Sequence, residues 1–364
     1  MFQDVRSHYE RYPYPIYPLA VSVRRCDTYA LNLDALWATF NWVLPPHAAR
    51  RILVAGCGSF SPYPFAVANP RIPITALDLS RRNIRRARLH CLLHGRCNLT
   101  FEVGDLCNPL AASGGYGLID AYGVLHHLED PQTGLNALVV RLASGGIVRI
   151  MLYNRIYRQL EESLRRSLRR AKIRDVKVLK RLIARTKPGS RLYRFVQDSY
   201  DATSPSGLAD ALLHPCVHTF GVDEFLELVD KAGLKPLLFA HAGARDDVEG
   251  EINRLRHMEA QEKAPGNFIA YLGRKTDQPA RKQAASLLML NPCLRKSVGA
   301  FNVGTLRILP RLGNSVPSIG GAERRFLRRF QNPLSWDSLS AADQTTAREY
   351  LKALFLFRLG SAPP

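Results

Sequence analysis

Short apolar runs alternate with amphipathic segments between residues 51 and 153, and no other feature of the sequence constrains the fold as strongly. A helical segment capped by Ser80 and another opened by Asp130-Pro131 carry apolar residues at helical spacing. Alternation of this kind predicts a parallel sheet with helices on both faces. The runs expected to form strands are 51–55, 72–77, 99–103, 118–124 and 147–153.

The first of these strands delivers the turn Ala55-Gly56-Cys57-Gly58. Gly56 permits a tight turn, and Gly58 lets the backbone approach a ligand closely. A purely structural turn has the same pattern, so two glycines alone leave the choice open. The third glycine of a dinucleotide fingerprint is absent, because Ser61 stands there, and this argues against NAD.

Polar or glycine-rich residues also follow the next three strands. Asp78 ends the second strand at the distance from Gly58 where a carboxylate accepts hydrogen bonds from a ribose. Gly104-Asp105-Leu106 ends the third strand, and its carboxylate could accept a hydrogen bond from an adenine amino group. The fourth strand leads into Gly123-Val124 and then into His126-His127. Ligands bind at this edge of open α/β sheets, so we expect these strand ends to form one nucleoside site.

The motifs VAGCG, ALDLS, VGDL and GVLHHLEDP, in this order, resemble those of class I S-adenosylmethionine-dependent methyltransferases. The sequence is also similar to an uncharacterised bacterial subgroup of these enzymes, through a Tyr-Pro-Tyr-Pro arm near the start and the GVLHHL motif. The resemblance implies a Rossmann-like, doubly wound seven-stranded α/β sheet and the cofactor S-adenosyl-L-methionine. The residues that it implies in the cofactor site are Ala55, Gly56, Cys57, Gly58, Asp78, Leu79, Gly104, Asp105, Leu106, Gly123 and Val124.

The resemblance places His126 and His127 at the edge of the site, where either could act as a general base, and Tyr153 is a further catalytic candidate. Packing roles are the alternative for all three. The candidates for contacting the acceptor substrate are Tyr12, Tyr14, Arg155, Arg158 and His214. The aromatic residues suit a sulfonium through cation–π contact, and the arginines suit an anionic acceptor.

Positive charge is concentrated in one segment. The chain has 51 Lys and Arg against 31 Asp and Glu. Residues 155–194 contain 15 of these cations and three acids, a net charge of +12. Ile156, Leu160, Leu164 and Leu168 recur every four residues, which predicts an amphipathic helix with a cationic face. A lid over the acceptor site, an anionic membrane surface and a nucleic-acid patch are all compatible with it.

We expect five parts along the chain. They are an N-terminal aromatic arm and helix (1–50), the methyltransferase core (51–154), a basic helical insertion forming a lid or substrate site (155–220), the closing helix and strands of the core (221–275) and a helical C-terminal appendage (276–364). The tyrosines and prolines of 8–18 predict an extended arm. The seven cysteines include no C-x-x-C pair, so we predict no metal site and free thiols in a reducing compartment.

The sequence thus predicts an enzyme that transfers a methyl group to a small or lipid-like, anionic acceptor by in-line displacement. An RNA methyltransferase that uses the basic face and a cofactor-binding protein without activity are the alternatives. Polar residues 1–10 predict no signal peptide, and we expect a cytoplasmic protein that could lie at the periphery of a membrane. The oligomeric state and the role of residues 276–364 stay open.

Overall fold

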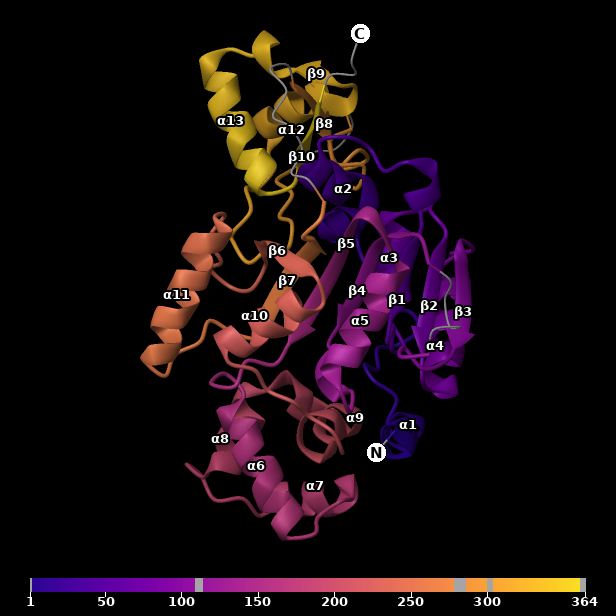
Figure 1. Ribbon diagram of the computed structural model, residues 1–364, viewed down its shortest axis with the longest axis vertical. Coiled ribbons are helices and arrows are strands. Elements are labelled where there is room, and N and C mark those ends of the chain that lie inside the picture. The colour runs from indigo at the N-terminus through magenta and orange to yellow at the C-terminus, as the bar shows by residue number, and fades with distance from the viewer. Residues whose placement is uncertain (1, 109–113, 278–285, 300–303, 361–364) are drawn as a thin grey trace.

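The computed structural model describes residues 2–108, 114–277, 286–299 and 304–360. Its centre is a seven-stranded sheet in the order β3-β2-β1-β4-β5-β7-β6 (Figure 1). The first five strands are parallel to one another, and β7 is antiparallel to both of its neighbours. This arrangement confirms the predicted fold class. The strands are β1 Ile52–Ala55, β2 Ile74–Asp78, β3 Leu99–Val103, β4 Tyr116–Tyr122, β5 Leu142–Leu152, β6 Leu234–Phe239 and β7 Phe268–Arg274.

Helices cover both faces of this sheet. Ile52 and Val54 belong to one apolar cluster and Leu53 and Ala55 to the other, because successive side chains of a strand point to opposite faces. Asp130 caps one covering helix by accepting hydrogen bonds from the backbone of the first turn, as the sequence predicts. The core helices are α3 Pro62–Ala68, α4 Arg81–Leu93, α5 Pro131–Arg141, α10 Val222–Lys231 and α11 Val248–Ala260.

The N-terminal segment differs from its prediction. Residues 2–11 form helix α1 (Phe2–Arg11), so the extended arm begins only at Tyr12. The prediction is wrong for residues 8–11 because Pro13 restricts the residue just before it and nothing earlier in the chain. After the arm follow the 3-10 helix η1 (Arg25–Leu31) and α2 (Leu33–Asn41).

The basic insertion is a small helical unit and not one long helix. It contains α6 Gln159–Arg170, α7 Val176–Ala184, α8 Arg191–Asp198, η4 Tyr200–Thr203, α9 Pro205–Leu208 and the π-helix η5 Ala209–Leu213. Leu164 and Leu168 of α6 are buried against Leu179, Phe195 and neighbouring residues of the same unit. The apolar face of α6 is therefore occupied within the chain. Figure 1 shows this unit and α1 at the same end of the molecule, away from the C-terminal elements.

Residues 286–360 are also not a purely helical appendage. Strands β8 Ser286–Leu290, β9 Leu334–Ser335 and β10 Leu356–Gly360 form a three-stranded antiparallel sheet beside α12 Gly321–Arg328 and α13 Ala341–Lys352. Ser340 caps α13, as predicted. The apolar core of this part is continuous with that of the large sheet, since Leu290 and Phe355 cluster with Ala35 and Ile52. Within the described ranges, no helix combines the length and apolar character needed to cross a bilayer.

Candidate active site

A cavity of about 950 Å³ lies at the carboxyl ends of the parallel strands. Its walls come mainly from three parts of the chain: the strand ends with the turns that follow them, the N-terminal segment from α1 to η1, and the basic insertion. One residue of the C-terminal part, Arg311, also lines it. Its volume is near the upper end of the range for small-molecule sites, ~300–1,000 Å³, so two ligands of modest size could share it.

The glycine turn after β1 lies directly under the arm. Gly58 has a φ of +56°, and a Cβ at this position would lie 2.6 Å from the Tyr14 carbonyl oxygen. Ser59 fastens the arm to the turn, since its backbone N–H donates to Tyr14 O (3.2 Å) and its hydroxyl donates to Pro15 O. The glycine therefore serves the close approach of two backbone segments as well as the bend of the chain.

Asp78 is buried at the end of β2 and holds this turn in place. One carboxylate oxygen accepts from Gly58 N (2.8 Å), and the other accepts from Ser80 N (2.8 Å) and Asn83 Nδ2 (3.2 Å). Burial raises the pKa of Asp78 against the opposing effect of these hydrogen bonds. Each carboxylate oxygen has two lone pairs, so the group keeps capacity for a further donor such as a ribose hydroxyl.

All but one of the residues that the resemblance implies for the cofactor line the cavity. The exception is Ala55, which is buried as the last residue of β1 and does not reach it. The lining residues of this set are Gly56, Cys57, Gly58, Asp78, Leu79, Gly104, Asp105, Leu106, Gly123 and Val124.

Two tyrosine–carboxylate pairs that the sequence did not predict also line the cavity. Tyr9 donates to Asp210 (3.0 Å) and Tyr14 donates to Asp201 (2.9 Å), and all four residues line the cavity. Burial raises the pKa of Asp210 to about 6, against the opposing effect of the Tyr9 hydrogen bond. No local pattern marks Asp201 or Asp210, because each acts through a partner distant in the sequence.

The two histidines after β4 have different surroundings. His126 is fully buried, its ring stacks on Tyr153 at 3.7 Å, and it does not line the cavity. His127 and Tyr153 both line it. His127 Nδ1 lies 2.9 Å from Cys216 O, which can only accept, so Nδ1 carries the proton. Burial lowers the pKa of His127 to about 3, so the ring is neutral and its Nε2 has a free lone pair.

Of the candidate substrate residues, some line the cavity and others do not. Tyr14 and Arg158 line the cavity, and the Arg158 guanidinium lies 4.2 Å from the centre of the Tyr153 ring. Tyr12 and Arg155 do not line it, and Arg155 instead forms an exposed ion pair with Glu224. His214 is buried behind the wall, with its ring centre 3.8 Å from that of His127.

Comparison with known proteins agrees with this geometry. A protein-family model described as "Methyltransferase domain" matches residues 53–150, which span β1 to β5. The chain contains a methyltransferase domain. The structure of PKMT2 from Rickettsia typhi shares the fold, with a TM-score of 0.57 at 14% identity over 96% of this chain and 78% of that chain. For PKMT2 in complex with AdoHcy the TM-score is 0.53, with the same identity and coverage.

A relative from Synechococcus sp. (strain ATCC 27144 / PCC 6301 / SAUG 1402/1), "Uncharacterized protein syc1184_c", is 29% identical over 249 residues. The match covers 65% of this chain and 60% of that relative. The methyltransferase domain confirms the methyltransferase class predicted from the sequence. The cofactor S-adenosyl-L-methionine stays a prediction. The narrower subgroup stays a prediction.

Proposed function

We propose that this chain transfers a methyl group from S-adenosyl-L-methionine to a small or lipid-like, anionic acceptor enclosed in the cavity. The observation that carries the proposal is that one cavity joins the glycine turn at Gly56–Gly58 to three guanidinium groups, those of Arg149, Arg158 and Arg311.

The glycine side of the cavity fits the cofactor. The turn at Gly58 brings backbone to the cavity wall, and Asp105 lines the wall where the sequence predicts the adenine. Asp78 keeps one lone pair for a ribose hydroxyl. The bound cofactor would supply a methyl group already activated by its sulfonium. The protein then has to align the acceptor and exclude water, which an enclosed site covered by the arm can do.

The other side of the cavity supports an anionic acceptor. The charges of Arg149 and Arg158 are offset by Asp120 (3.1 Å) and Glu161 (2.8 Å). Arg311 differs, since no carboxylate of the described residues lies within ion-pair distance of it. Its side chain is exposed at the cavity, with Nε donating to Asp27 O (3.2 Å). An unneutralised guanidinium there favours a carboxylate or phosphate on the acceptor.

His127 is the proposed general base for an acceptor that must lose a proton. Its Nδ1–H is held by Cys216 O, and this contact fixes the ring with Nε2 as the basic nitrogen. The low pKa keeps the imidazole unprotonated at neutral pH. A positioned base contributes about 10²–10⁴-fold to the rate when proton loss is part of the step and its pKa lies near the operating pH. Because the pKa of His127 is far lower, its contribution should lie at the lower end of this range.

A nucleic-acid methyltransferase is the second candidate, and the exposed charge of the insertion supports it. Arg166, Arg169 and Arg170 of α6 are exposed, as are Lys177, Lys180 and Arg181 of α7. The apolar face of α6 packs within the insertion and is not available to a membrane, although Val178 and Leu182 of α7 stay exposed. We also propose a cytoplasmic location, which the free cysteines among the described residues fit.

The test is incubation of the full chain with labelled cofactor and fractionated cell extract. We expect label in a small-molecule or lipid fraction. Label in RNA, with binding that falls steeply with salt, would support the second candidate instead. Binding of cofactor by calorimetry with no labelled fraction would support a protein without transferase activity.

Once an acceptor is found, Arg311→Gln tests its charge. Loss of a charge-assisted contact should raise KM roughly 10–100-fold and change kcat little. Arg307→Gln is the matched control, because Arg307 is exposed in the same segment but does not line the cavity. Equal KM values for the two variants would contradict an anionic acceptor at Arg311.

A further inference from the structure

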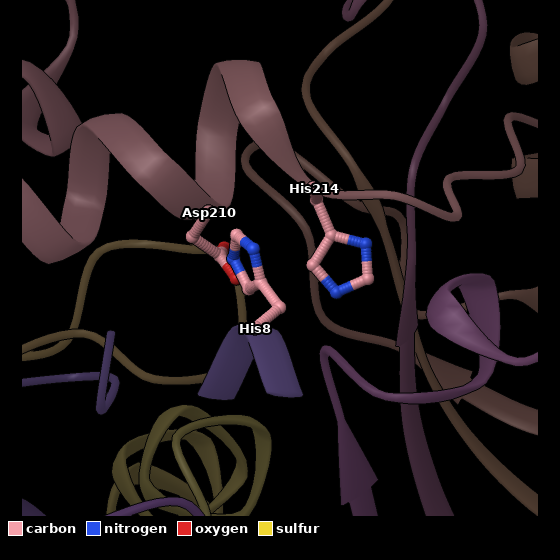
Figure 2. A group of neighbouring side chains, drawn as sticks. All are labelled: His8, Asp210 and His214. Atoms are coloured by element: carbon pink, nitrogen blue, oxygen red, sulfur yellow. The ribbon is translucent and has the colours of Figure 1, made fainter. Parts of the chain in front are cut away.

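Three side chains with metal-ligating atoms meet at the cavity wall, where Asp210 faces the cavity (Figure 2). His8 lies in α1 and Asp210 lies in η5, and His214 is the residue that follows η5. One potential ligand atom from each lies within 4.8 Å of the other two. Figure 2 shows His8 against Asp210, with the ring of His214 beside them. We predicted no metal site from the spacing of the cysteines. That spacing gives no information on His8 and His214, which lie far apart in the chain.

The polar atoms of this cluster are buried without full hydrogen bonding. His214 is 1% exposed and Asp210 is 4% exposed. Within the described part of the chain, the Nε2 atoms of His8 and His214 have no hydrogen-bond partner. Buried polar atoms are rarely left in this state, so each such atom needs an explanation such as an ion or a ligand.

The protons of the cluster can also be assigned. Cys216 N donates to His214 Nδ1 at 3.2 Å, so the proton of this neutral ring lies on Nε2. A metal bound at Nε2 would move this proton to Nδ1 and end the contact with Cys216 N. The contact that would be lost is weak, because 3.2 Å is at the long end of the range for N–H donors. The metal bond would form at Nε2 of His214, where the buried N–H now has no acceptor.

We propose that His8, Asp210 and His214 bind a divalent first-row transition metal, with Zn²⁺ as the best match. Two imidazoles and one carboxylate are a ligand set of Zn²⁺ and related ions, whereas Mg²⁺ and Ca²⁺ prefer oxygen ligands. Bond lengths of ~2.0–2.2 Å place neighbouring ligand atoms ~3–4 Å apart, so the side chains have to close by about an ångström. Rotation of the partly exposed His8 side chain can supply this movement.

The metal would link α1 to the insertion across the wall of the cavity. Asp210 already accepts a hydrogen bond from the cavity-lining Tyr9, so an ion on its carboxylate would fix the position of this tyrosine as well. The metal is therefore a positioning element for the wall of the acceptor side, and this role does not depend on which acceptor is methylated.

The experiment measures Zn²⁺ binding by the chelator-treated full chain in competition with a chromophoric chelator. We expect one Zn²⁺ per chain with a submicromolar Kd and a rise in melting temperature that Mg²⁺ does not produce. His8→Gln should weaken binding at least roughly 100-fold. His257→Gln, on the exposed face of α11, is the matched control and should bind as the unchanged protein does.

The variant His8→Gln is chosen because His8 is only half-buried and its Nε2 has no partner to lose, so the metal-free variant should melt as the unchanged protein does. Absence of stoichiometric Zn²⁺ binding would overturn the proposal. So would Zn²⁺ binding that His8→Gln leaves unchanged, since the ion would then be held elsewhere, for example at cysteines. Calorimetry with S-adenosyl-L-methionine on the same samples keeps this result separate from the proposed methyl transfer.

Discussion

The contact between the glycine turn and the arm can be tested with two alanine substitutions. Gly58 and Gly95 have almost the same backbone conformation, with φ of +56° and +64°. They differ in their surroundings. A Cβ at Gly58 would lie 2.6 Å from Tyr14 O and 3.2 Å from Pro15 Cδ, whereas a Cβ at Gly95 has nothing within 4 Å among the described residues. Gly95→Ala therefore measures the backbone effect alone, and Gly58→Ala adds the displacement of the arm.

The expected size of each effect follows from these contacts. An alanine in the left-handed region costs about 1–2 kcal/mol, and this applies to both variants. In Gly58→Ala the arm must also move away, which removes the hydrogen bonds of Ser59 to Tyr14 O and Pro15 O. At about 0.5–1.5 kcal/mol each, these bonds add roughly 1–3 kcal/mol. Gly58→Ala should therefore melt roughly 1–4 °C below Gly95→Ala.

Calorimetric melting and limited trypsin digestion would measure the difference, since Arg11 and Arg24 flank the arm. We expect faster cleavage at these sites in Gly58→Ala, and at least a tenfold loss of affinity for S-adenosyl-L-methionine, about 1.4 kcal/mol. Gly95→Ala should keep the arm protected and the cofactor affinity unchanged. If both variants melt at the same temperature and bind cofactor equally, the arm does not rest on the turn as described.

Four further substitutions test other parts of the structure. Asp78→Asn should weaken cofactor binding at least tenfold in calorimetry and lower stability by about 2–3 kcal/mol, because an amide cannot accept all the N–H groups that now reach the carboxylate; unchanged affinity would contradict the ribose assignment. His127→Gln should lower kcat by about 10²-fold, the lower end of the range for a general base because of its low pKa, with unchanged cofactor affinity, and an unchanged kcat would exclude it as the base. Burial would raise the pKa of Glu251, but hydrogen bonds, including one from His241 at 2.7 Å, lower it from its usual 4.5 to about 2. The resulting stabilisation, on the order of 3 kcal/mol, is present above pH ~4.5 and is lost as the pH falls toward 2, so acid unfolding of Glu251→Gln should show a weaker pH dependence over this interval. Asn291→Ala should cost about 2–4 kcal/mol in denaturant unfolding, because its buried amide joins Tyr29 O, Leu354 O and Cys293 N, and a loss below 1 kcal/mol would show that these groups find other partners.

The glycine side of the site could be predicted because its signals are local. Within residues 51–153, the residues that line the site follow the end of each strand by a few positions. Gly56 and Gly58, for example, follow β1. Asp78 is itself the last residue of β2. Parallel strands bring such residues to one edge of the sheet, so knowing the fold class was enough to group them.

The acceptor side could not be predicted in this way. Asp201, Asp210 and Arg311 reach the cavity only through tertiary packing, and no pattern around them in the sequence marks this role. Residues 286–360 were expected to be helical because β8 pairs with β9 and β10, which lie far along the chain, and each strand is too short to show a clear alternation. Helix α1 was missed because the prolines that follow it dominated the interpretation of the whole segment.

The cavity is completed by segments that lie on both sides of the methyltransferase core in the sequence. Tyr14 comes before β1 and Arg311 comes after β7, and both reach the same enclosed space. When β7 has just left the ribosomal exit tunnel, all strands of the large sheet are therefore available, but the cavity still lacks Arg311. The ability to bind the acceptor should therefore arise late in synthesis. A fragment of residues 53–150 should keep the turns that face the nucleoside but leave them exposed to solvent.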